Sequence, residues 1–253
     1  MKQPLSESDI ERFLRDGFTV VRDAFSRDVA AQGREFIWKR LGLSPDRPEA
    51  WSEPFIHIRE NYSAEPFCRV MNPRLRAAFD QLMGPERWIE HDRFGWWPIL
   101  FPGFATPPKP DKFGWHVDGS NFHHRLTSKA QGLVTLFLFS DIGPGGGGTA
   151  MLLGSHRDVA RILADAEPEG LAYETLLERL PHPDLSKLVE ATGAAGDVVL
   201  MHPFTIHAVN ANSGNQVRIA CNPQFQLREP MQLLRPDGAY SAVERATRFA
   251  LSL

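Results

Sequence analysis

Cysteine is scarce in this chain of 253 residues, which contains only Cys68 and Cys221. Two cysteines cannot build the framework of several disulfides that stabilises small secreted domains. Long apolar runs are also absent: no stretch approaches the roughly 18 residues that a membrane span requires, and residues 1–13 contain no apolar segment typical of a secretory signal. We therefore expect a reducing, cytoplasmic setting and no membrane partner.

A strong excess of one charge is lacking as well. The formal net charge is −3, and 42% of the residues are hydrophobic and 23% charged, which is the composition of an ordinary globular protein. Proteins that bind nucleic acid usually carry a marked basic excess. We therefore expect no nucleic-acid partner, and the sequence does not indicate an oligomeric state.

The N-terminal part, residues 1–87, is predicted to be mostly helical. Hydrophobic periodicity, serine caps and closing glycines predict helices near residues 10–14, 28–41 and 75–83. Residues 44–66 are interrupted by four prolines, so we expect them to be loop. These segments precede the region in which the pattern changes to strands.

Residues 88–229 contain short β-prone runs between glycine- and proline-rich turns. The strongest is 131–140, and others lie at 197–201 and 218–221. Residues from about 156 to 190 are polar and predicted to form a helical insertion. We therefore predict one domain over residues 1–253, mainly β with α: a double-stranded β-helix (jelly roll, cupin-like) flanked by N-terminal helices.

The most informative tripeptide is His116-Val117-Asp118. Side chains alternate along an extended strand, so His116 and Asp118 point to the same side. A second histidine from a distant strand can complete a set of two histidines and one carboxylate. Such a set holds non-haem Fe(II) and leaves the opposite coordination positions open. We assign the second histidine to His207, just after the strand predicted at 197–201.

Other histidines compete for these roles. His182-Pro183-Asp184 repeats the spacing, but a proline removes a ladder hydrogen bond from a central strand. His202 also follows the 197–201 strand, yet the next residue is proline, which is more typical of a structural or pocket residue. The plain alternative for the whole set is a core histidine beside an aspartate that caps a turn.

Arg218 lies in an apolar, β-prone stretch, residues 217–221, where an ordinary surface arginine is not expected. A guanidinium stays charged when buried and can bind a carboxylate through two parallel hydrogen bonds. A dicarboxylate that chelates the metal through its 2-oxo acid end would present its far carboxylate to such an arginine.

Several motifs follow one another in a fixed order along most of the chain. They are Asp16-Gly17-Phe18-Thr19-Val20, Trp115-His116-Val117-Asp118-Gly119, Ser140-Asp141 with the glycine-rich turn after it, Gly154-Ser155-His156-Arg157, Gly196-Asp197-Val198-Val199, and then His207, Asn212 and Arg218. This ordered set resembles the phytanoyl-CoA dioxygenase family of Fe(II)/2-oxoglutarate-dependent oxygenases, and it is far more specific than any single motif.

The resemblance implies a function and a site. His116, Asp118 and His207 would be the catalytic metal ligands for Fe(II), and Arg218 would bind the distal carboxylate of 2-oxoglutarate, which is consumed together with O₂. The implied chemistry is the oxidative decarboxylation of 2-oxoglutarate coupled to oxidation of a substrate C–H bond.

The resemblance also implies that Thr135 and Phe137, on one face of the predicted strand, line the co-substrate pocket. Two positions depart from the family pattern. Leu153 stands where proline usually precedes Gly-Ser-His, and Val209 stands where some members have a hydroxyl residue that helps to hold 2-oxoglutarate. We expect that contact either to be absent or to come from Thr135.

The carboxylate of Asp118 separates two chemistries. Related halogenases resemble this pattern but have glycine or alanine at the carboxylate position, which opens a site for chloride. Because the carboxylate is present here, we expect hydroxylation, desaturation or oxidative ring closure instead of halogenation.

The substrate is expected to be a polar, ring-containing small molecule, such as a glycoside or another natural product of secondary metabolism. Aromatic rings mixed with polar side chains favour such a ligand, and no basic cluster suited to a CoA phosphate is evident. Loops 50–66 and 102–112 are expected to contribute, because loops on a rigid scaffold usually carry specificity. The candidate substrate-binding residues are Trp96, Asn121, Phe122, His123 and His124.

Two other functions are compatible with the predicted fold. One is a catalytically inactive jelly-roll module that only binds, and the other is a cupin-type metal isomerase. The intact triad and Arg218 argue against the first. The second class usually has more histidines in its metal set and lacks the trailing arginine.

Overall fold

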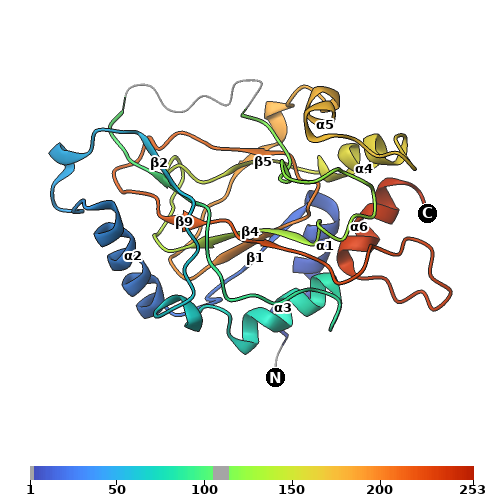
Figure 1. Ribbon diagram of the computed structural model, residues 1–253, viewed down its shortest axis with the longest axis horizontal. Coiled ribbons are helices and arrows are strands. Elements are labelled where there is room, and N and C mark those ends of the chain that lie inside the picture. Colours follow the sequence, from blue (N-terminus) through green and yellow to red (C-terminus); the bar gives the residue numbers. More distant parts are fainter. Residues whose placement is uncertain (1–2, 105–113) are drawn as a thin grey trace.

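Two antiparallel sheets form the centre of the computed structural model, which describes residues 3–104 and 114–253 (Figure 1). The larger sheet has the order β1 (Phe18–Val21), β7 (Val198–Met201), β4 (Leu133–Leu138) and β10 (Gln224–Phe225), and β9 (Ala220–Cys221) also pairs with β4. The smaller sheet has the order β6 (Leu188–Glu190), β5 (Ala150–Leu152) and β8 (His207–Ala208). The strands predicted at 131–140, 197–201 and 218–221 therefore all contribute to the larger sheet.

Strand β4 shows how the two faces of the larger sheet differ. All six of its residues are buried, as expected for a strand covered on both sides. Val134, Leu136 and Leu138 join Met151 of the smaller sheet in one apolar cluster. Leu133 and Phe137 belong to a second cluster, which includes residues of the helices. Position along β4 thus decides whether a side chain faces the space between the sheets or the helical layer.

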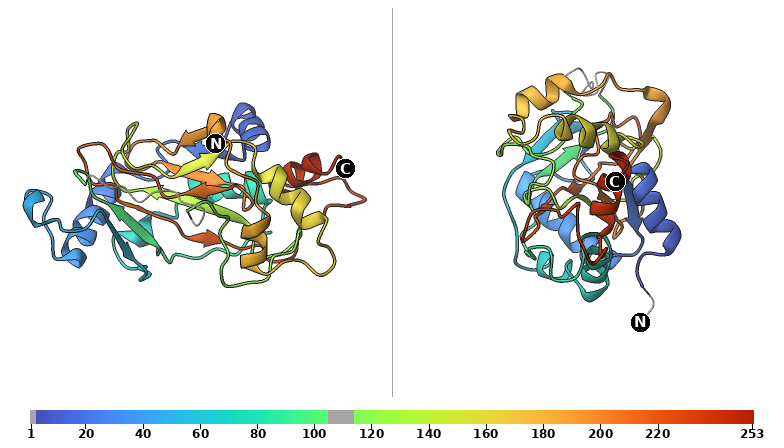
Figure 2. Two further views of the ribbon diagram at one scale, coloured as in Figure 1. Left: turned by 90° about the horizontal axis from the view of Figure 1, so that it is seen from above. Right: turned by 90° about the vertical axis from the view of Figure 1, so that its right-hand side faces the viewer.

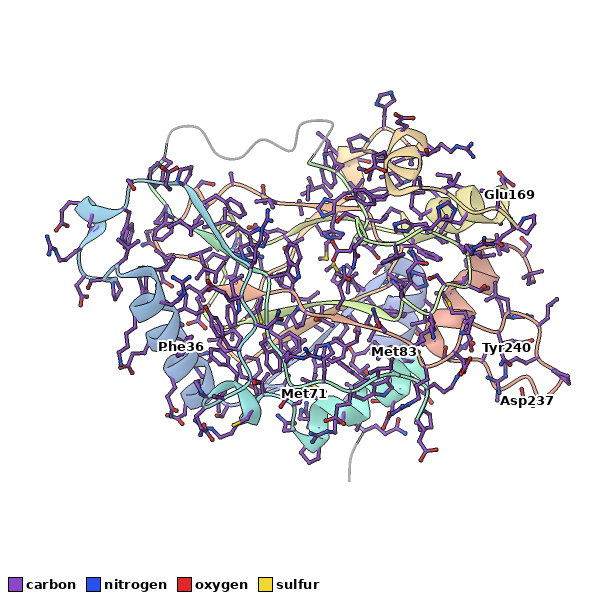
Figure 3. The ribbon with its side chains drawn as sticks, in the orientation of Figure 1. Phe36, Met71, Met83, Glu169, Asp237 and Tyr240 are labelled. Atoms are coloured by element: carbon purple, nitrogen blue, oxygen red, sulfur yellow. The ribbon has the colours of Figure 1, made fainter. Side chains whose placement is uncertain are left out.

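The N-terminal helices predicted from the sequence are confirmed. They are α1 (Glu7–Asp16), capped by Ser6 and Gly17, α2 (Arg27–Leu41), capped by Ser26 and Gly42, and α3 (Pro73–Met83), capped by Asn72. Figure 1 shows α2 and α3 along one side of the strands and α4 and α5 at the other. Met71 and Met83, which flank the body of α3, are buried in the helix-facing core (Figure 3).

Residues 44–66 were expected to be loop, and most of them are. The exception is β2 (Phe55–Ile58), which pairs with β3 (Trp97–Leu100). The four prolines of this segment lie outside β2, so every residue of β2 keeps its backbone N–H donor. A short 3₁₀ turn, Pro48–Ala50, precedes β2, and another, Phe67–Arg69, follows it. A bridge between Leu100 and Arg218 connects β3 to the segment that leads into β9.

The segment expected to be a helical insertion ends in a strand. It contains α4 (His156–Ala164) and α5 (Tyr173–Arg179), then a 3₁₀ turn (Leu185–Lys187) that leads directly into β6. Figure 2 shows α4 and α5 at the same end of the molecule as the C-terminal helix α6 (Ala242–Ala250). In residues 3–104 and 114–253, no helix combines the length and the apolar character needed to cross a membrane.

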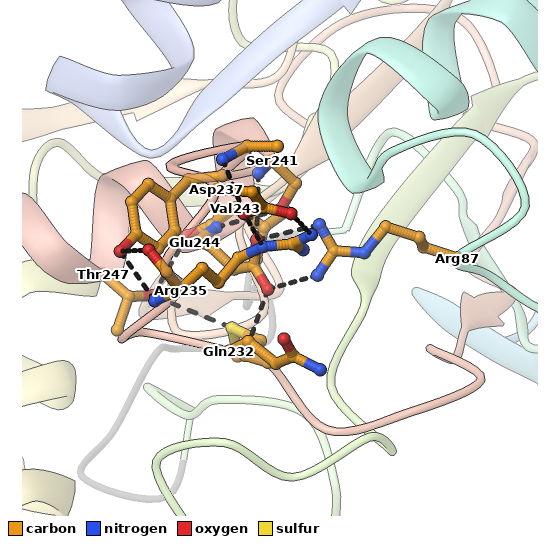
Figure 4. Close-up of polar contacts among 11 residues, drawn as sticks. Arg87, Gln232, Arg235, Asp237, Ser241, Val243, Glu244 and Thr247 are labelled. Atoms are coloured by element: carbon orange, nitrogen blue, oxygen red, sulfur yellow. Dashed lines mark hydrogen bonds and ion pairs between the residues drawn. The ribbon is translucent and has the colours of Figure 1, made fainter.

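Helix α6 was not predicted from the sequence, and a buried carboxylate at its start attaches it to the fold. Glu244, 1% exposed, forms an ion pair with Arg87 and accepts hydrogen bonds from the backbone N–H groups of Gln232 (2.7 Å) and Ser241 (2.9 Å) (Figure 4). Burial opposes ionisation of Glu244, but these partners outweigh it and lower its pKa.

Replacing this carboxylate is expected to destabilise the protein. In Glu244→Ala the buried donors lose their acceptor, so we expect the free energy of unfolding to fall by about 2–3 kcal/mol at pH 7. Because the folded-state pKa is lowered, the difference from wild type should be present above the unfolded pKa of about 4.3 and shrink as the pH falls below it. Urea unfolding measures both effects. Glu178→Ala, at an exposed position of α5, is the control, and equal losses in the two variants would contradict the assignment.

Candidate metal centre

Three side chains from two distant parts of the chain converge on one point. Nε2 of His116 and Nε2 of His207 each lie 3.4 Å from Oδ1 of Asp118. The possible ligand atoms of the three residues all lie within 4.8 Å of one another. Among the described residues this is the one such group of three or more histidine, cysteine or acidic side chains. The triad proposed from the sequence is therefore assembled in space.

Strand pairing explains why these side chains face each other. His116 and His207 form an antiparallel bridge, with backbone N–H···O distances of 3.0 Å and 2.9 Å. In the smaller sheet His207 lies opposite Met151, which belongs to the apolar cluster between the sheets. Residues directly opposite in an antiparallel pair share a face, so both histidines point into that space. Asp118, two residues beyond His116, points the same way.

Both histidine rings are held in the orientation that a metal ligand requires. Nδ1 of His116 lies 2.9 Å from the carbonyl oxygen of Gly114, and Nδ1 of His207 lies 2.9 Å from that of Thr205. A carbonyl only accepts, so Nδ1 of each ring carries the proton and donates it. Nε2 of each ring is then the nitrogen that faces Asp118 and is available to a metal ion. A backbone carbonyl that fixes the far nitrogen is a common partner of metal-binding histidines.

The electrostatics of the group favour an ionised carboxylate. Burial alone would raise the pKa of Asp118, but His207 and His116 hold it well below its usual range. Burial lowers the pKa of His207, and the adjacent Asp118 carboxylate more than reverses this, so the net shift is upward. A partly buried carboxylate between two imidazoles is an environment that can accept a divalent cation.

The competing histidines are placed elsewhere. His182 is exposed, and Asp184 accepts hydrogen bonds from the backbone and hydroxyl of Ser186 in a surface turn. His202 is fully buried; its Nε2 lies 3.3 Å from the carbonyl of Val243 and 3.2 Å from the hydroxyl of Thr247. Neither belongs to the group of potential metal ligands that His116, Asp118 and His207 form.

A cavity of about 490 Å³ connects the three donors to Arg218. Its wall combines aromatic rings, amides and hydroxyls with the three potential metal ligands. The lining residues are Phe55, His57, Trp96, Pro98, His116, Asp118, Gly119, Ser120, Asn121, Thr149, Tyr173, His207, Ala208, Val209, Arg218, Asn222 and Gln224.

Arg218 is a buried cation, and no carboxylate of a described residue forms an ion pair with it. It is 2% exposed, and its guanidinium donates to the carbonyl of Pro98 (2.7 Å) and to the hydroxyl of Thr149 (3.0 Å). Its Nε is buried without a hydrogen-bond partner. Burial lowers its pKa to about 10, so the group is still charged at neutral pH. A buried cation with an unused donor can accept an anionic ligand.

Thr135 and Phe137 do not line this cavity, contrary to the expectation from the resemblance. Phe137 belongs to the helix-facing core and lies 5.2 Å from the ring of Phe94. Thr135 shares that face, and its hydroxyl donates to the carbonyl of Pro223. The expectation selected the wrong face of β4, because a shift of one residue exchanges the two sides of a strand. The hydroxyl beside Arg218 belongs instead to Thr149, and Val209 lines the cavity.

Only part of the predicted substrate-binding set reaches the cavity. Trp96, half exposed, and Asn121 line it. Phe122 borders a separate small hollow, which Asp118 also lines. His123 is exposed, with Nε2 2.8 Å from the carbonyl of Glu169, a residue labelled in Figure 3, and His124 is fully buried. A turn at 119–122 ends the extended segment that contains Asp118. Strand alternation therefore no longer predicts where the side chains after this turn point.

Sequence reasoning missed several lining residues. Asn222 and Gln224 alternate with Arg218 along one face, which is a signal that could have identified them. Phe55 and His57 come from the predicted 50–66 loop, whereas residues 105–112 of the other expected loop lie outside the described residues. Tyr173 comes from α5, and no local pattern indicates that α5 approaches the site.

Comparison with known proteins identifies relatives of the chain. The model of the phytanoyl-CoA dioxygenase (PhyH) family matches residues 13–220. Ectoine dioxygenase from Stutzerimonas stutzeri is 28% identical over 233 residues, covering 83% of this chain and 72% of that protein.

Two solved structures resemble the fold. The non-haem alpha-ketoglutarate-dependent carbocyclase SnoK from nogalamycin biosynthesis has a TM-score of 0.52 at 18% identity, covering 90% of this chain and 86% of SnoK. EctD from S. alaskensis with bound Fe has a TM-score of 0.51 at 21% identity, covering 93% of this chain and 83% of EctD. The jelly-roll fold predicted from the sequence is confirmed, with antiparallel sheets that do not close into a barrel.

Removing the carboxylate should abolish tight metal binding. In Asp118→Ala two histidines remain, so we expect the Co(II) affinity measured by calorimetry to fall by more than the roughly 10–100-fold produced by loss of an outer contact. His182→Ala removes the histidine of the competing motif and should leave the affinity unchanged. Equal affinities of wild type and Asp118→Ala, or a large loss in His182→Ala, would show that the ion binds elsewhere.

Proposed function

Because the chain belongs to the phytanoyl-CoA dioxygenase family and is thus an Fe(II)/2-oxoglutarate-dependent oxygenase, we propose that His116, Asp118 and His207 hold the iron and that Arg218 binds 2-oxoglutarate. The observation that carries this proposal is that one cavity is lined both by the three converging donors and by a buried arginine without a carboxylate partner. The first feature suits a divalent metal, and the second suits the far carboxylate of a dicarboxylic acid.

The residues present are suited to both ligands. Two imidazoles and a carboxylate form the donor set typical of non-haem Fe(II), with positions left open on the cavity side. The bound iron would supply the oxidative chemistry that decarboxylates 2-oxoglutarate and oxidises a substrate C–H bond. Arg218, fixed by Pro98 and Thr149, would orient the co-substrate within the cavity that the three donors also line. Thr149 takes the place that Thr135 was expected to fill.

Asp118 also determines which oxidation we propose. Its carboxylate occupies the position that would have to be vacant for chloride to bind iron in a halogenase. We therefore propose that the enzyme hydroxylates, desaturates or oxidatively cyclises its substrate.

The proposed substrate is a polar, ring-containing small molecule, such as a glycoside or another natural product. This rests on the other side chains that line the cavity: the ring of Trp96 is half exposed, and the amides of Asn121, Asn222 and Gln224 can donate and accept hydrogen bonds. The side-chain oxygen of Asn222 is buried without a partner, so it can accept a hydroxyl or N–H group of the substrate. The carbocyclase SnoK belongs to nogalamycin biosynthesis, which is compatible with a natural-product substrate.

Truncating Arg218 should weaken co-substrate binding selectively. Loss of a buried, charge-assisted contact costs at least about 2 kcal/mol, so in Arg218→Ala we expect the 2-oxoglutarate concentration at half saturation to rise by roughly 30-fold or more. The Co(II) affinity should change little, because Arg218 is not among the three donors. Titration of succinate formation against 2-oxoglutarate, with calorimetry for the metal, gives both quantities.

Arg34→Ala is the matched control for Arg218→Ala. Arg34 is a partly buried arginine whose guanidinium donates to the carbonyl of Phe139 and does not line the cavity. Its removal should leave the 2-oxoglutarate requirement unchanged. An unchanged requirement in Arg218→Ala, or the same increase in both variants, would contradict the role given to Arg218.

A substrate screen tests the proposed substrate class. Compounds are scored by the increase in succinate release above the rate without added compound, with glycosides and cyclic natural products compared against acyl-CoA thioesters. We expect stimulation by members of the first group, and Asp118→Ala should abolish it. Stimulation by acyl-CoA thioesters alone would overturn the proposed substrate class while leaving the oxygenase assignment intact.

A further inference from the structure

Two adjacent histidines beside the metal centre have opposite environments. His123 is exposed, and its ring reaches away from the site to the carbonyl of Glu169. His124 is fully buried behind the turn that follows Asp118 and does not line the cavity. A buried histidine costs free energy unless its ring nitrogens are hydrogen-bonded, so the partners of His124 are informative.

Both ring nitrogens of His124 have defined partners. Nδ1 lies 2.9 Å from the side-chain amide nitrogen of Gln131, which is 3% exposed. An amide NH₂ only donates, so Nδ1 accepts and the proton lies on Nε2. Nε2 is 3.0 Å from the carbonyl oxygen of Gly119 and donates to it. Gln131, His124 and Gly119 therefore form a buried chain of hydrogen bonds that ends one residue beyond Asp118.

The ring of His124 also packs directly against the Gly119 backbone. Gly119 has a φ of 122°, a conformation that favours glycine. A Cβ at this position would lie 2.8 Å from Cε1 of His124 and 2.4 Å from Cζ of Phe122. The turn after Asp118 is thus packed tightly against these two rings, and any shift of the His124 ring would be transmitted to it.

His124 is itself fixed by the segment that leads into α5. Its backbone forms a pair of hydrogen bonds with Leu171, both 2.8 Å long. Its ring stacks on Tyr173, with centroids 5.8 Å apart and an angle of 29° between the planes, and Tyr173 lines the cavity. The ring is therefore held by the backbone, by Gln131 and by an aromatic neighbour.

We propose that His124 is a positioning residue for Asp118: through Gly119 it fixes the turn that aims the carboxylate at His116 and His207. The inference rests on the proposed role of Asp118 as a metal ligand. It replaces the expectation that His124 contacts the substrate. Outer partners of this kind typically change metal affinity by roughly 10–100-fold when they are lost.

The test is a calorimetric Co(II) titration of the full chain, with the visible spectrum of the bound Co(II) as a second readout of its coordination. His124→Phe keeps an aromatic ring but loses the donor, so we expect a roughly 10–100-fold weaker affinity and an altered spectrum. His124→Gln can place an amide N–H near the Nε2 position and should restore most of the affinity. His123→Phe, the same change at the exposed neighbour, should behave as wild type.

The outcomes separate this inference from the proposed function. Wild-type affinity and spectrum in a folded His124→Phe, or equal losses in His124→Phe and His124→Gln, would overturn the positioning role, whereas tight Co(II) binding by Asp118→Ala would overturn the metal site itself. If His124→Phe does not fold, Gln131→Leu decides the question. It removes only the donor that fixes the His124 proton, so reduced Co(II) affinity supports the inference and unchanged affinity contradicts it.

Discussion

The paired backbone hydrogen bonds between His116 and His207 are the constraint on which the site depends. They bring two segments about ninety positions apart in the chain into register, and the alternation of side chains then places both imidazoles and Asp118 on the inner face. A slip of one residue would turn the ring of one histidine to the opposite face. The register of this pair is therefore as important for the proposed chemistry as the identity of the three side chains.

Much of the remaining structure supports the turn that carries His207. The backbone N–H of His202 and the hydroxyl of Thr205 both donate to the carbonyl of Gly17 at the end of α1, and each hydrogen bond is 2.8 Å long. The backbone N–H of Ile206 donates to the hydroxyl of Ser155 (2.9 Å), and the ring of His202 reaches α6. Gly17, with φ of 87°, has no room for a Cβ, which would lie 2.6 Å from Nδ1 of His156.

These contacts give a physical reason for the ordered motifs. The Asp16-Gly17 and Gly154-Ser155-His156 elements lie far from Asp118 in sequence, yet they meet at the His202–Ile206 turn and hold the carbonyl of Thr205 that orients His207. Residues of these motifs thus hold in place the segment that precedes one proposed metal ligand, His207.

The sequence predicted what depends on local order. Serine caps and glycine stops located α1 and α2, and strand alternation placed His116 beside Asp118. Prediction from the sequence failed where the position of a side chain depends on which face of a strand or helix packs against which neighbouring element. Thr135 and Phe137 were assigned to the cavity, but the helical layer covers that face of β4. His124 was assigned to the substrate because it adjoins the site in sequence, and only the path of the turn after Gly119 reveals that it is buried. Thr149 and Tyr173 approach the cavity through tertiary packing, which no local pattern encodes.

The proposed function requires that one cavity hold both the iron, at His116, Asp118 and His207, and the far carboxylate of 2-oxoglutarate, at Arg218. Anomalous diffraction from crystals grown without oxygen, with Fe(II) and 2-oxoglutarate added, tests it most directly. The account predicts an iron peak in contact with Nε2 of His116, Nε2 of His207 and a carboxylate oxygen of Asp118, and a 2-oxoglutarate carboxylate hydrogen-bonded to Arg218. An iron peak away from these three side chains, or 2-oxoglutarate bound without contact to Arg218, would contradict it.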